Sequence, residues 1–382
     1  MIKILHLITD LDYGGAENFL ISLVKQKNIR KHKTKIVVMT SGGLSVQSTI
    51  KEGIDVETLG LKRGEFNPLK AIRLIKIIKN FSPNIVQTWL YHADLLGSLC
   101  MPFTNVDKLV WNFRCSNMDL SQYSFQSRIV FYLLRMLAKV PALIVINSHD
   151  GRKFHEKVGF RPNGWNTIPN GVDTNKFKSF KSAREKLFTK LNIPKDSVLI
   201  GNVGRFDPMK DYKTLFRSFV SIKKRFKKVK FLLIGRDLNR QNNALMKMID
   251  PPLLRDNLFQ ETSFLPPTEN IHKIIPGLDL FCTSSAFGEG CPNVLLEAMS
   301  CSVPCVVTDV GDSKAILGDC GIVVKPGDYK TLTDGMEKLL RIDKTVLRKM
   351  LRRGRKKIIK HFSIEYAEGQ YLAMYKKLMK SK

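Results

Sequence analysis

Short apolar runs recur along the chain, and the segments between them carry apolar residues at helical spacing. In the first half, these runs predict strands at Lys3–Ile8, Thr34–Met39, Val56–Leu59, Ile85–Thr88, Val110–Phe113 and Leu143–Asn147. In the second half, they predict strands at Val198–Val203, Lys230–Ile234, Leu280–Thr283 and Cys305–Thr308. Strands that alternate with helices favour parallel sheets that are covered by helices on both faces. The pattern therefore predicts an α/β fold.

The length of 382 residues suits two domains rather than one. The turn dipeptide Asn170-Gly171 and the polar, basic stretch 176–190 mark the expected boundary. We predict two Rossmann-like, doubly wound domains, 1–177 and 178–363, with a cleft between them. The segment 364–379 is predicted to close the chain as an amphipathic helix, because its tyrosines and leucines recur three and four residues apart.

The net charge and the motif content of the sequence limit the classes of binding partner to expect. The chain has 63 Lys and Arg against 34 Asp and Glu, a net charge of +29, which attracts polyanions. It has no zinc-finger, RRM or helix-turn-helix signature, so we expect no nucleic-acid partner and favour an anionic membrane surface or a nucleotide diphosphate. No apolar run reaches about 18 residues, so no membrane span is expected. The seven cysteines lack CxxC pairs, which indicates a reduced, cytoplasmic protein.

The stretch 287–299 carries the most specific pattern of the chain, two glutamates separated by seven residues. Glu289 lies in a Gly/Pro loop, whereas Glu297 lies in an apolar run that is typical of a helix, where a carboxylate without a partner is costly to bury. Gly290 lets backbone amides approach a ligand, and Pro292 is expected in the first helical turn. A helix start suits a phosphate, and two carboxylates suit a polyhydroxylated ligand. The alternative is a helix-start acid and an unrelated surface acid.

Two further turns follow predicted strands. Gly14 and Gly15 form a turn after the first strand, but the pattern lacks the full GxGxxG of dinucleotide-binding proteins, so bound NAD is not expected. Gly204 and Arg205 close the strand Val198–Val203, and Lys210 follows five residues later. Arginine and lysine together can neutralise a diphosphate as it leaves. The alternative is a pair of ordinary solvated cations.

The remaining candidates lie in the first half. His92 follows the strand Ile85–Thr88, where it could hydrogen-bond a sugar hydroxyl, although a lone histidine is more often structural. Asp94 is a weaker candidate that could instead cap a helix starting at residue 95. Arg114 and Ser116 follow the strand Val110–Phe113 and are candidates from topology alone. The segment 170–173 is interpreted as a structural turn rather than a direct contact.

These motifs, in this order and spacing, resemble the retaining glycosyltransferases of family 4, which have the GT-B fold, and the resemblance covers nearly the whole chain. It implies that domain 1–177, joined by the closing segment 364–382, binds the acceptor, and that domain 178–363 binds a nucleotide-sugar donor. The catalytic residues that it implies are Glu289, His92, Arg205 and Lys210. The donor-binding residues that it implies are Gly14, Gly15, Arg205, Lys210, Glu289, Gly290, Cys291, Pro292, Asn293 and Glu297. Asp94 and Arg114 are the weaker acceptor-side candidates.

The resemblance also implies roles for single residues. Glu297 would hold the ribose, Arg205 and Lys210 the diphosphate, and Glu289 with His92 the sugar, with retention of the anomeric configuration. No protein carboxylate would act as nucleophile, and the leaving phosphate would assist deprotonation of the acceptor. No cofactor other than the nucleotide-sugar co-substrate is expected. Asp10-Leu-Asp12 spells the DxD of another glycosyltransferase fold, but the two cations can carry the diphosphate charge, so no metal is expected.

The expected setting is the cytoplasm, at the inner face of a membrane, with a glycan or lipid-linked acceptor in cell-surface polysaccharide synthesis. A UDP-sugar is favoured, and a GDP-sugar remains possible. The basic, apolar stretch 68–79 could dock on anionic lipid or be an ordinary solvated helix face, and 222–230 and 347–360 are also strongly basic. Two alternatives remain open: a sugar-nucleotide epimerase of the same architecture, and a non-enzymatic polyanion- or membrane-binding module.

Overall fold

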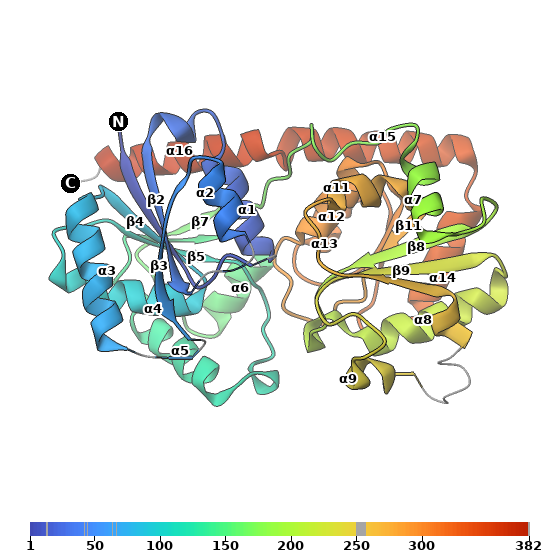
Figure 1. Cartoon of the computed structure of the whole chain (residues 1–382), viewed down its shortest axis with the longest axis horizontal. Helices are drawn as coiled ribbons and strands as arrows, with labels where there is room; N and C mark the ends of the chain where they lie inside the picture. The colour runs from blue at the N-terminus through green and yellow to red at the C-terminus, as the bar shows by residue number, and fades with distance from the viewer. Residues whose placement is uncertain are drawn as a thin grey trace. The chain divides into compact units, whose positions relative to one another are not determined.

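The computed structural model describes residues 1–12, 14–41, 43, 45–62, 64–65, 67–249 and 257–380. The chain divides into two compact units, an N-terminal unit of Met1–Gly171 with Ile364–Lys382 and a C-terminal unit of Val172–Ser363. Each unit is a parallel sheet with helices on its faces (Figure 1). The prediction of two doubly wound, Rossmann-like α/β sheets is therefore confirmed.

The N-terminal sheet has the order β3-β2-β1-β4-β5-β6-β7 in the described part of the chain, and neighbouring strands are parallel. Its strands are β1 Lys3–Ile8, β2 Lys33–Thr40, β3 Asp55–Leu61, β4 Ile85–Trp89, β5 Leu109–Phe113, β6 Leu143–Ile146 and β7 Trp165–Thr167. Its helices are α1 Gly15–Val24, η1 Ile29–Lys31, α2 Val46–Lys51, α3 Pro68–Phe81, α4 Tyr91–Cys100, η2 Met101–Phe103, η3 Leu120–Gln122, α5 Phe125–Met136, α6 His149–Lys157 and α16 Ile364–Lys380.

Two apolar clusters lie on the two faces of this sheet. One cluster joins the strands to α3, α4 and α5, and the other joins them to α1 and α16. Strand residues alternate between the clusters, as Leu5 and Leu7 pack with the first and Ile4 and Ile8 with the second. This alternation is the period-two pattern that a strand buried on both faces must satisfy.

The C-terminal sheet has the order β10-β9-β8-β11-β12-β13 among the described residues, again with parallel neighbours. Its strands are β8 Val198–Val203, β9 Val229–Ile234, β10 Thr262–Leu265, β11 Leu280–Cys282, β12 Cys305–Thr308 and β13 Ile322–Val324. Its helices are α7 Ala183–Leu191, η4 Pro208–Lys210, α8 Tyr212–Arg225, α9 Asn243–Met246, α11 Ile271–Ile274, η5 Ile275–Gly277, α12 Asn293–Ser300, α13 Ser313–Leu317, α14 Tyr329–Arg341 and α15 Lys344–His361.

Every strand that the sequence predicts is present, with ends that differ by at most two residues. The short strands β7, β10 and β13 were not predicted. Each has only three or four residues, and β7 has no fully buried side chain; β13 is apolar throughout, but its three residues are too few for a periodic pattern.

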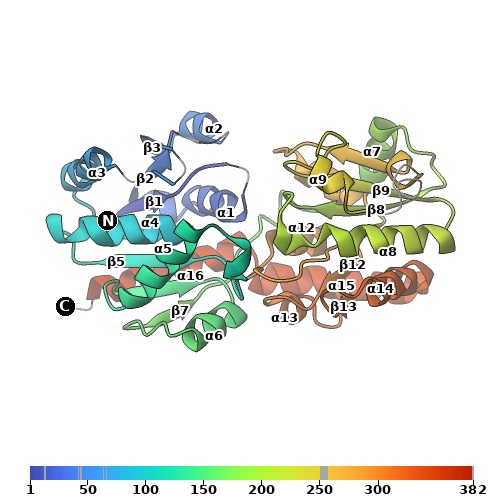
Figure 2. The ribbon, with the colours of Figure 1, turned by 90° about the horizontal axis from the view of Figure 1, so that it is seen from below.

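The last helix, α16, returns to the N-terminal unit and packs beside α1 (Figure 2). Its buried side chains, which include Tyr371 and Tyr375, join the cluster that contains Phe19. The Tyr375 hydroxyl donates to Gln87 Oε1 at 2.5 Å, and Glu368 accepts from the backbone N of Asn28 at 2.7 Å. The closing segment is therefore a structural part of this unit's core.

Two general features bear on the setting of the protein. No helix in the described part of the chain is long and apolar enough to cross a membrane. All seven cysteines are described, and all are free thiols.

Candidate functional site

Lys210 and Glu289 form a mostly buried ion pair at the carboxyl edge of the C-terminal sheet. Lys210 ends η4, which follows β8, and Glu289 lies in the loop between β11 and α12. The distance from Lys210 Nζ to Glu289 Oε1 is 2.5 Å, and the side chains are only 16% and 14% exposed. Ligands of open α/β sheets bind at this edge, so the fold brings two of the predicted residues to the expected place.

Hydroxyl groups hold this pair in position. Ser285 Oγ donates to Glu289 Oε1 at 2.9 Å, and Thr308 Oγ1 in turn donates to the carbonyl of Ser285 at 2.7 Å. Ser284 Oγ donates to the carbonyl of Lys210 at 2.7 Å. Sequence reasoning missed these three hydroxyls, although their positions at the ends of β11 and β12 are the signal that could have found them.

The environment keeps Glu289 ionised. Burial by itself would raise the pKa of this carboxyl, but the charge of Lys210, the hydrogen bonds from Lys210 and Ser285 and the charge of Arg205 together lower the pKa below its ordinary value. A lysine ammonium has three donors, so Lys210 can hold Glu289 and still donate to a ligand. The pair can therefore present a fixed carboxylate and a cation together.

The Glu289 loop is also fixed from the side of the next strand. Gly311 has φ +59°, and a Cβ there would lie 2.1 Å from the carbonyl oxygen of Glu289 and 2.5 Å from that of Gly290. The backbone N of Asp312 donates to the same Gly290 carbonyl at 2.9 Å. Gly288, inside the loop, also has a positive φ of +79°. Glycine is thus required at 311 both by conformation and by close backbone approach.

Arg205 lies at the same turn as Lys210. Its Nε donates to Asp207 Oδ2 at 2.9 Å, and its side chain is about half exposed, at 54%. A Cβ at Gly204 would lie 3.2 Å from Lys210 Cε, so the glycine leaves room for the lysine stem. The turn thus carries one guanidinium that faces solvent and one ammonium that is fixed by Glu289.

Glu297 differs from Glu289 in having no fixed partner. It lies in α12 and is partly buried, and burial raises its pKa to about 7, although the charge of Lys176 opposes this rise. No described residue forms a hydrogen bond or an ion pair with its carboxyl group. A carboxyl group in this state can accept hydrogen bonds from a ligand without first losing a protein contact.

The helix starts near Pro292, as the sequence predicted. Pro292 is the N-cap of α12 and Asn293 is its first residue. Gly290, Cys291 and Pro292 are all buried. The first-turn N–H groups and the positive end of the helix dipole therefore lie directly beside the Glu289 loop.

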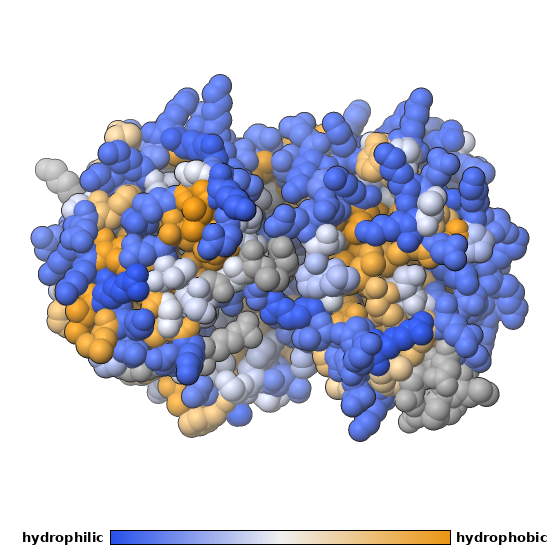
Figure 3. Space-filling model, in the orientation of Figure 1, coloured by the Kyte–Doolittle hydropathy of each residue, from blue (hydrophilic) through white to orange (hydrophobic). Residues whose placement is uncertain are grey.

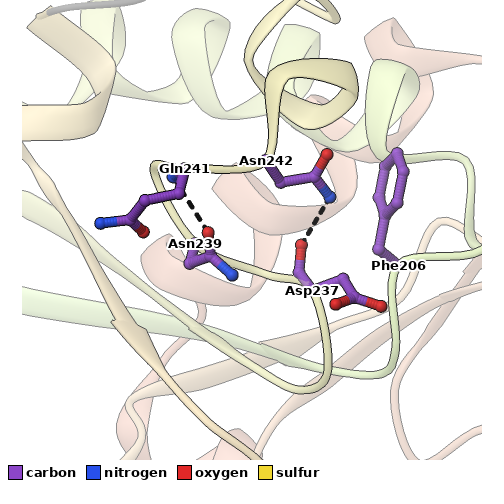
Figure 4. Close-up of a pocket in the computed structure, with 5 residues that line it drawn as sticks. All are labelled: Phe206, Asp237, Asn239, Gln241 and Asn242. Carbon is purple, nitrogen blue, oxygen red and sulfur yellow. Dashed lines mark hydrogen bonds between the residues drawn. The ribbon is translucent and has the colours of Figure 1, made fainter.

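A shallow polar pocket lies at the carboxyl ends of β8 and β9, next to Arg205. Phe206, Asp237, Asn239, Gln241 and Asn242 line it (Figure 4). Asn242 Nδ2 donates to the carbonyl of Asp237 at 2.7 Å, and Asn239 Oδ1 accepts from the backbone N of Gln241 at 2.9 Å. These amides hold the loop after β9 in shape at the same sheet edge.

The predicted glycine turn and His92 belong to the N-terminal unit. Gly14 is the N-cap of α1 and Gly15 is its first residue. A Cβ at Gly14 would lie 2.1 Å from Glu17 Oε2, the far end of a flexible side chain. His92 is the second residue of α4, is partly buried, and has a pKa lowered by that burial, so it is neutral near pH 7.

Asp94 does not lie where the sequence reasoning placed it. It sits inside α4, whose N-cap is Leu90, so it does not cap a helix that starts at residue 95. Its side chain is fully buried, and Thr88 Oγ1 donates to its Oδ1 at 2.5 Å. Burial raises its pKa to about 8, against the opposing effect of the hydrogen bond from Thr88. The carboxyl group of Asp94 is thus not exposed at the surface, and its acceptor-side role stays a prediction.

Arg114 is held by the protein itself. Its guanidinium donates to Asn170 Oδ1 at 2.6 Å and to the Tyr371 hydroxyl, and it lies 4.5 Å and 4.6 Å from the ring centres of Phe19 and Trp89. Arg114 therefore joins α16 and the end of the N-terminal segment to the sheet. The prediction of an acceptor-side role rested on topology and missed this structural one.

The described residues contain no group of three or more His, Cys, Asp or Glu side chains that could hold a metal ion. Within the Asp10-Leu-Asp12 motif, Asp10 Oδ1 accepts from the backbone N of Asp12 at 3.3 Å.

Two family models match the chain. "Glycosyltransferase Family 4" matches residues 13–176, and "Glycosyl transferases group 1" matches residues 183–357. Together they cover most of both units, and the second includes Arg205, Lys210, Glu289 and Glu297.

Individual relatives are distant but extend along the chain. The capsular polysaccharide biosynthesis glycosyltransferase CapM of Staphylococcus aureus is 24% identical, over 99% of this chain and 98% of that protein. An Escherichia coli UDP-Gal:alpha-D-GlcNAc-diphosphoundecaprenol alpha-1,3-galactosyltransferase is 23% identical, over 77% of this chain and 75% of that protein. Among solved structures, Anabaena HepE in complex with UDP and glucose has a TM-score of 0.85 at 19% identity, over 99% of this chain and 100% of that one.

Proposed function

Because the chain belongs to glycosyltransferase family 4, the glycosyl transferases group 1, and has the GT-B fold, we propose that it is a retaining glycosyltransferase that moves a sugar from a nucleotide-sugar donor to a lipid-linked saccharide. A UDP-sugar is the favoured donor. The acceptor belongs to the synthesis of a cell-surface polysaccharide, and the protein works at the cytoplasmic face of an anionic membrane.

The observation that carries the proposal is the fixed Lys210–Glu289 pair at the start of α12. A diphosphate placed beside this helix start would meet the free donors of Lys210, the fork of Arg205 and the positive end of the helix dipole. Glu289, fixed by Ser285, would accept from hydroxyl groups of the sugar. Glu297 would accept from the two hydroxyl groups of the ribose.

The reaction that this arrangement supports is the departure of a nucleoside diphosphate. As the bond between the anomeric carbon and the phosphate oxygen breaks, negative charge grows on that oxygen, and Lys210 and Arg205 would stabilise it. The acceptor oxygen then forms the new bond on the same face, and its proton passes to the leaving phosphate. Glu289 acts in this scheme by position and charge, not as a nucleophile.

The N-terminal unit would contribute His92 and the turn at Gly14 and Gly15 to the donor side, and the rest of the acceptor site. The neutral imidazole of His92 can both donate to and accept from sugar hydroxyls. The name of the Escherichia coli relative includes a UDP-sugar and a diphosphoundecaprenol-linked sugar, and HepE was solved with UDP. Both names support the choice of donor, and the name of the Escherichia coli relative also supports the class of acceptor.

The test is a panel of UDP- and GDP-sugars, in which slow donor hydrolysis and thermal shift are measured on the purified chain. One donor is expected to raise the melting temperature and to be hydrolysed. Lys210→Ala and Glu297→Ala should lose both responses. Lys213→Ala is the matched control, since this exposed lysine lies one helical turn away and its loss changes the net charge equally.

The outcome against the proposal is a wild-type chain that responds to no donor. If a donor is found, the anomeric configuration of the transferred sugar, measured by NMR on an early time point, tests retention separately. A product with inverted configuration would contradict attack of the acceptor on the same face as the leaving group, but it would not contradict the identity of the donor.

A further inference from the structure

Helix α5 carries an apolar stripe on its outer side. Phe125, Tyr132 and Met136 are 70%, 53% and 67% exposed, and Ile129 and Leu133 are exposed as well. Their spacing of three, four and seven residues places them on one side of the helix. The outer side of a surface helix normally carries polar residues, so this outer stripe is unusual.

The outer stripe is not part of the core. A different side of α5, with Phe131 and Leu134, is buried in the apolar cluster that contains Phe113 and Phe160. The helix therefore has one apolar face for the fold and a second one that the unit itself leaves uncovered. Isolated exposed apolar residues need no explanation, but a contiguous stripe marks an interaction surface.

The stripe continues onto neighbouring helices. Helix α4 lies between α3 and α5 and contacts both. Leu99 and Phe103 at the end of α4 and in η2, and Leu69 and Ile72 on α3, are also exposed. Figure 3 shows hydrophobic side chains at the surface over α3, at the left of the view, among strongly hydrophilic ones. We call this set of exposed residues on α3, α4, η2 and α5 the apolar face.

Most charges around the apolar face are positive, although Arg73 of α3 pairs with Glu57 of β3 at 3.1 Å. The sequence has no Asp or Glu from residue 120 to 149, and none from residue 66 to 93. Arg128, Arg135 and Lys139 lie on and just after α5 and are exposed, and α3 carries four further basic residues. Exposed aromatic and aliphatic side chains bordered by cations match the interface of an anionic bilayer.

We propose that the apolar face docks the protein on an anionic membrane, with the outer stripe of α5 inserted among the headgroups. The inference rests on the proposed function, because a lipid-linked acceptor is what would bring the enzyme to a bilayer. A second copy of the chain is a poorer occupant, since two such faces would bring their arginines and lysines against each other. The sequence reasoning named the stretch 68–79 either as a docking face or as an ordinary solvated helix face, and it did not single out α5.

The test is flotation of the full chain with vesicles of phosphatidylcholine and phosphatidylglycerol, and with vesicles of phosphatidylcholine alone. Phe125→Ser, Tyr132→Ser and Met136→Ser, combined in one variant, are expected to reduce binding to the anionic vesicles at least about tenfold. Arg128→Gln with Lys139→Gln should reduce it about 25-fold, because each basic side chain near an acidic surface contributes about fivefold. Wild type should bind the neutral vesicles weakly.

The matched control is Val346→Ser with Ile359→Ser, two exposed apolar residues on the strongly basic helix α15. This control should float like wild type. The proposal is overturned if the α5 serine variant floats like wild type, or if wild type sediments as a dimer that the serine variant abolishes. Donor hydrolysis is measured on every variant; it should be unchanged, and its absence in wild type would count against the proposed function but not against docking.

Discussion

Lys210 Nζ lies 2.5 Å from Glu289 Oε1, and the two side chains come from turns that are 79 residues apart in the sequence. The pair is mostly shielded from water, so each charge is stabilised by the other rather than by solvent. Removing only the lysine would leave a carboxylate in a site that cannot solvate it.

Lys210→Ala is therefore expected to destabilise the C-terminal unit by about 2–4 kcal/mol and to abolish donor turnover. Adding Glu289→Gln should restore most of the stability, because the neutral amide needs no cation, but should not restore turnover. Urea denaturation and donor hydrolysis of the two single variants and the double variant measure both effects. A double variant as unstable as Lys210→Ala would contradict the coupling.

Glu297→Gln is expected to stabilise the free protein at high pH. The raised pKa of about 7 means that the folded state holds a proton that the unfolded state releases above about pH 4.5. The protonated carboxyl group favours the folded state, so wild type loses this stabilisation as the pH rises from about 4.5 to 7. The glutamine variant has no group that titrates there and does not lose stability in this way. The variant should be more stable by about 1–2 kcal/mol at pH 8 and equal to wild type near pH 4.5.

The same Glu297→Gln variant should bind the donor at least about tenfold more weakly, since a charged acceptor of ribose hydrogen bonds is lost. Denaturation without donor and thermal shift with donor separate the two effects. A variant that is less stable than wild type at pH 8 would show that Glu297 serves the fold.

Gly311→Ala tests the close approach of the strand-end loop to Glu289. Alanine would strain the positive φ and would also press its Cβ against two backbone carbonyls, so we expect a loss of about 2–4 kcal/mol and of turnover. Gly327→Ala is the matched control, because Gly327 has φ +74° and nothing within 4 Å of its Cβ position. The control should cost about 1 kcal/mol and keep full turnover.

Asp94→Asn tests whether this carboxyl group is structural. The pKa of Asp94 in the folded protein is about 8, so the N-terminal unit of wild type becomes less stable as the pH rises from about 4 to 8. Over that range, the free energy of unfolding of the asparagine variant should fall by about 2–4 kcal/mol less than that of wild type. Transfer by the variant should stay within a few-fold of wild type. A large loss of transfer at unchanged stability would return Asp94 to the acceptor site.

The sequence predicts best those strands whose ends are determined by neighbouring residues in the sequence. Val198–Val203 and Cys305–Thr308 have the predicted strand bounds, because each is an apolar run that turn residues delimit. The strand β7 is three residues long and half-buried, and pairing with β6 rather than its own composition makes it a strand.

Contacts between distant residues explain the other differences. Arg114 donates to Tyr371, which lies 257 residues later in the chain, so no local sequence pattern can predict this hydrogen bond. Asp94 was predicted as a weak acceptor-side candidate or as the cap of a helix starting at residue 95, but α4 already starts at Tyr91, and Asp94 accepts from Thr88 in the interior. The Lys210–Glu289 pair was predicted as two separate roles, and only the fold makes it one unit.

The position of α16 determines the order in which the two units can be completed during synthesis. The N-terminal sequence leaves the ribosome first, but its core lacks Tyr371 and Tyr375 until the whole C-terminal unit has been made. Until then, Phe19 has Trp89 but not Tyr371 beside it, and the strand residues beneath α16 lack that helix, so the nascent N-terminal unit exposes apolar surface that chaperones recognise. We therefore expect the C-terminal unit, although translated later, to mature first, and the N-terminal unit to close only when α16 has been made.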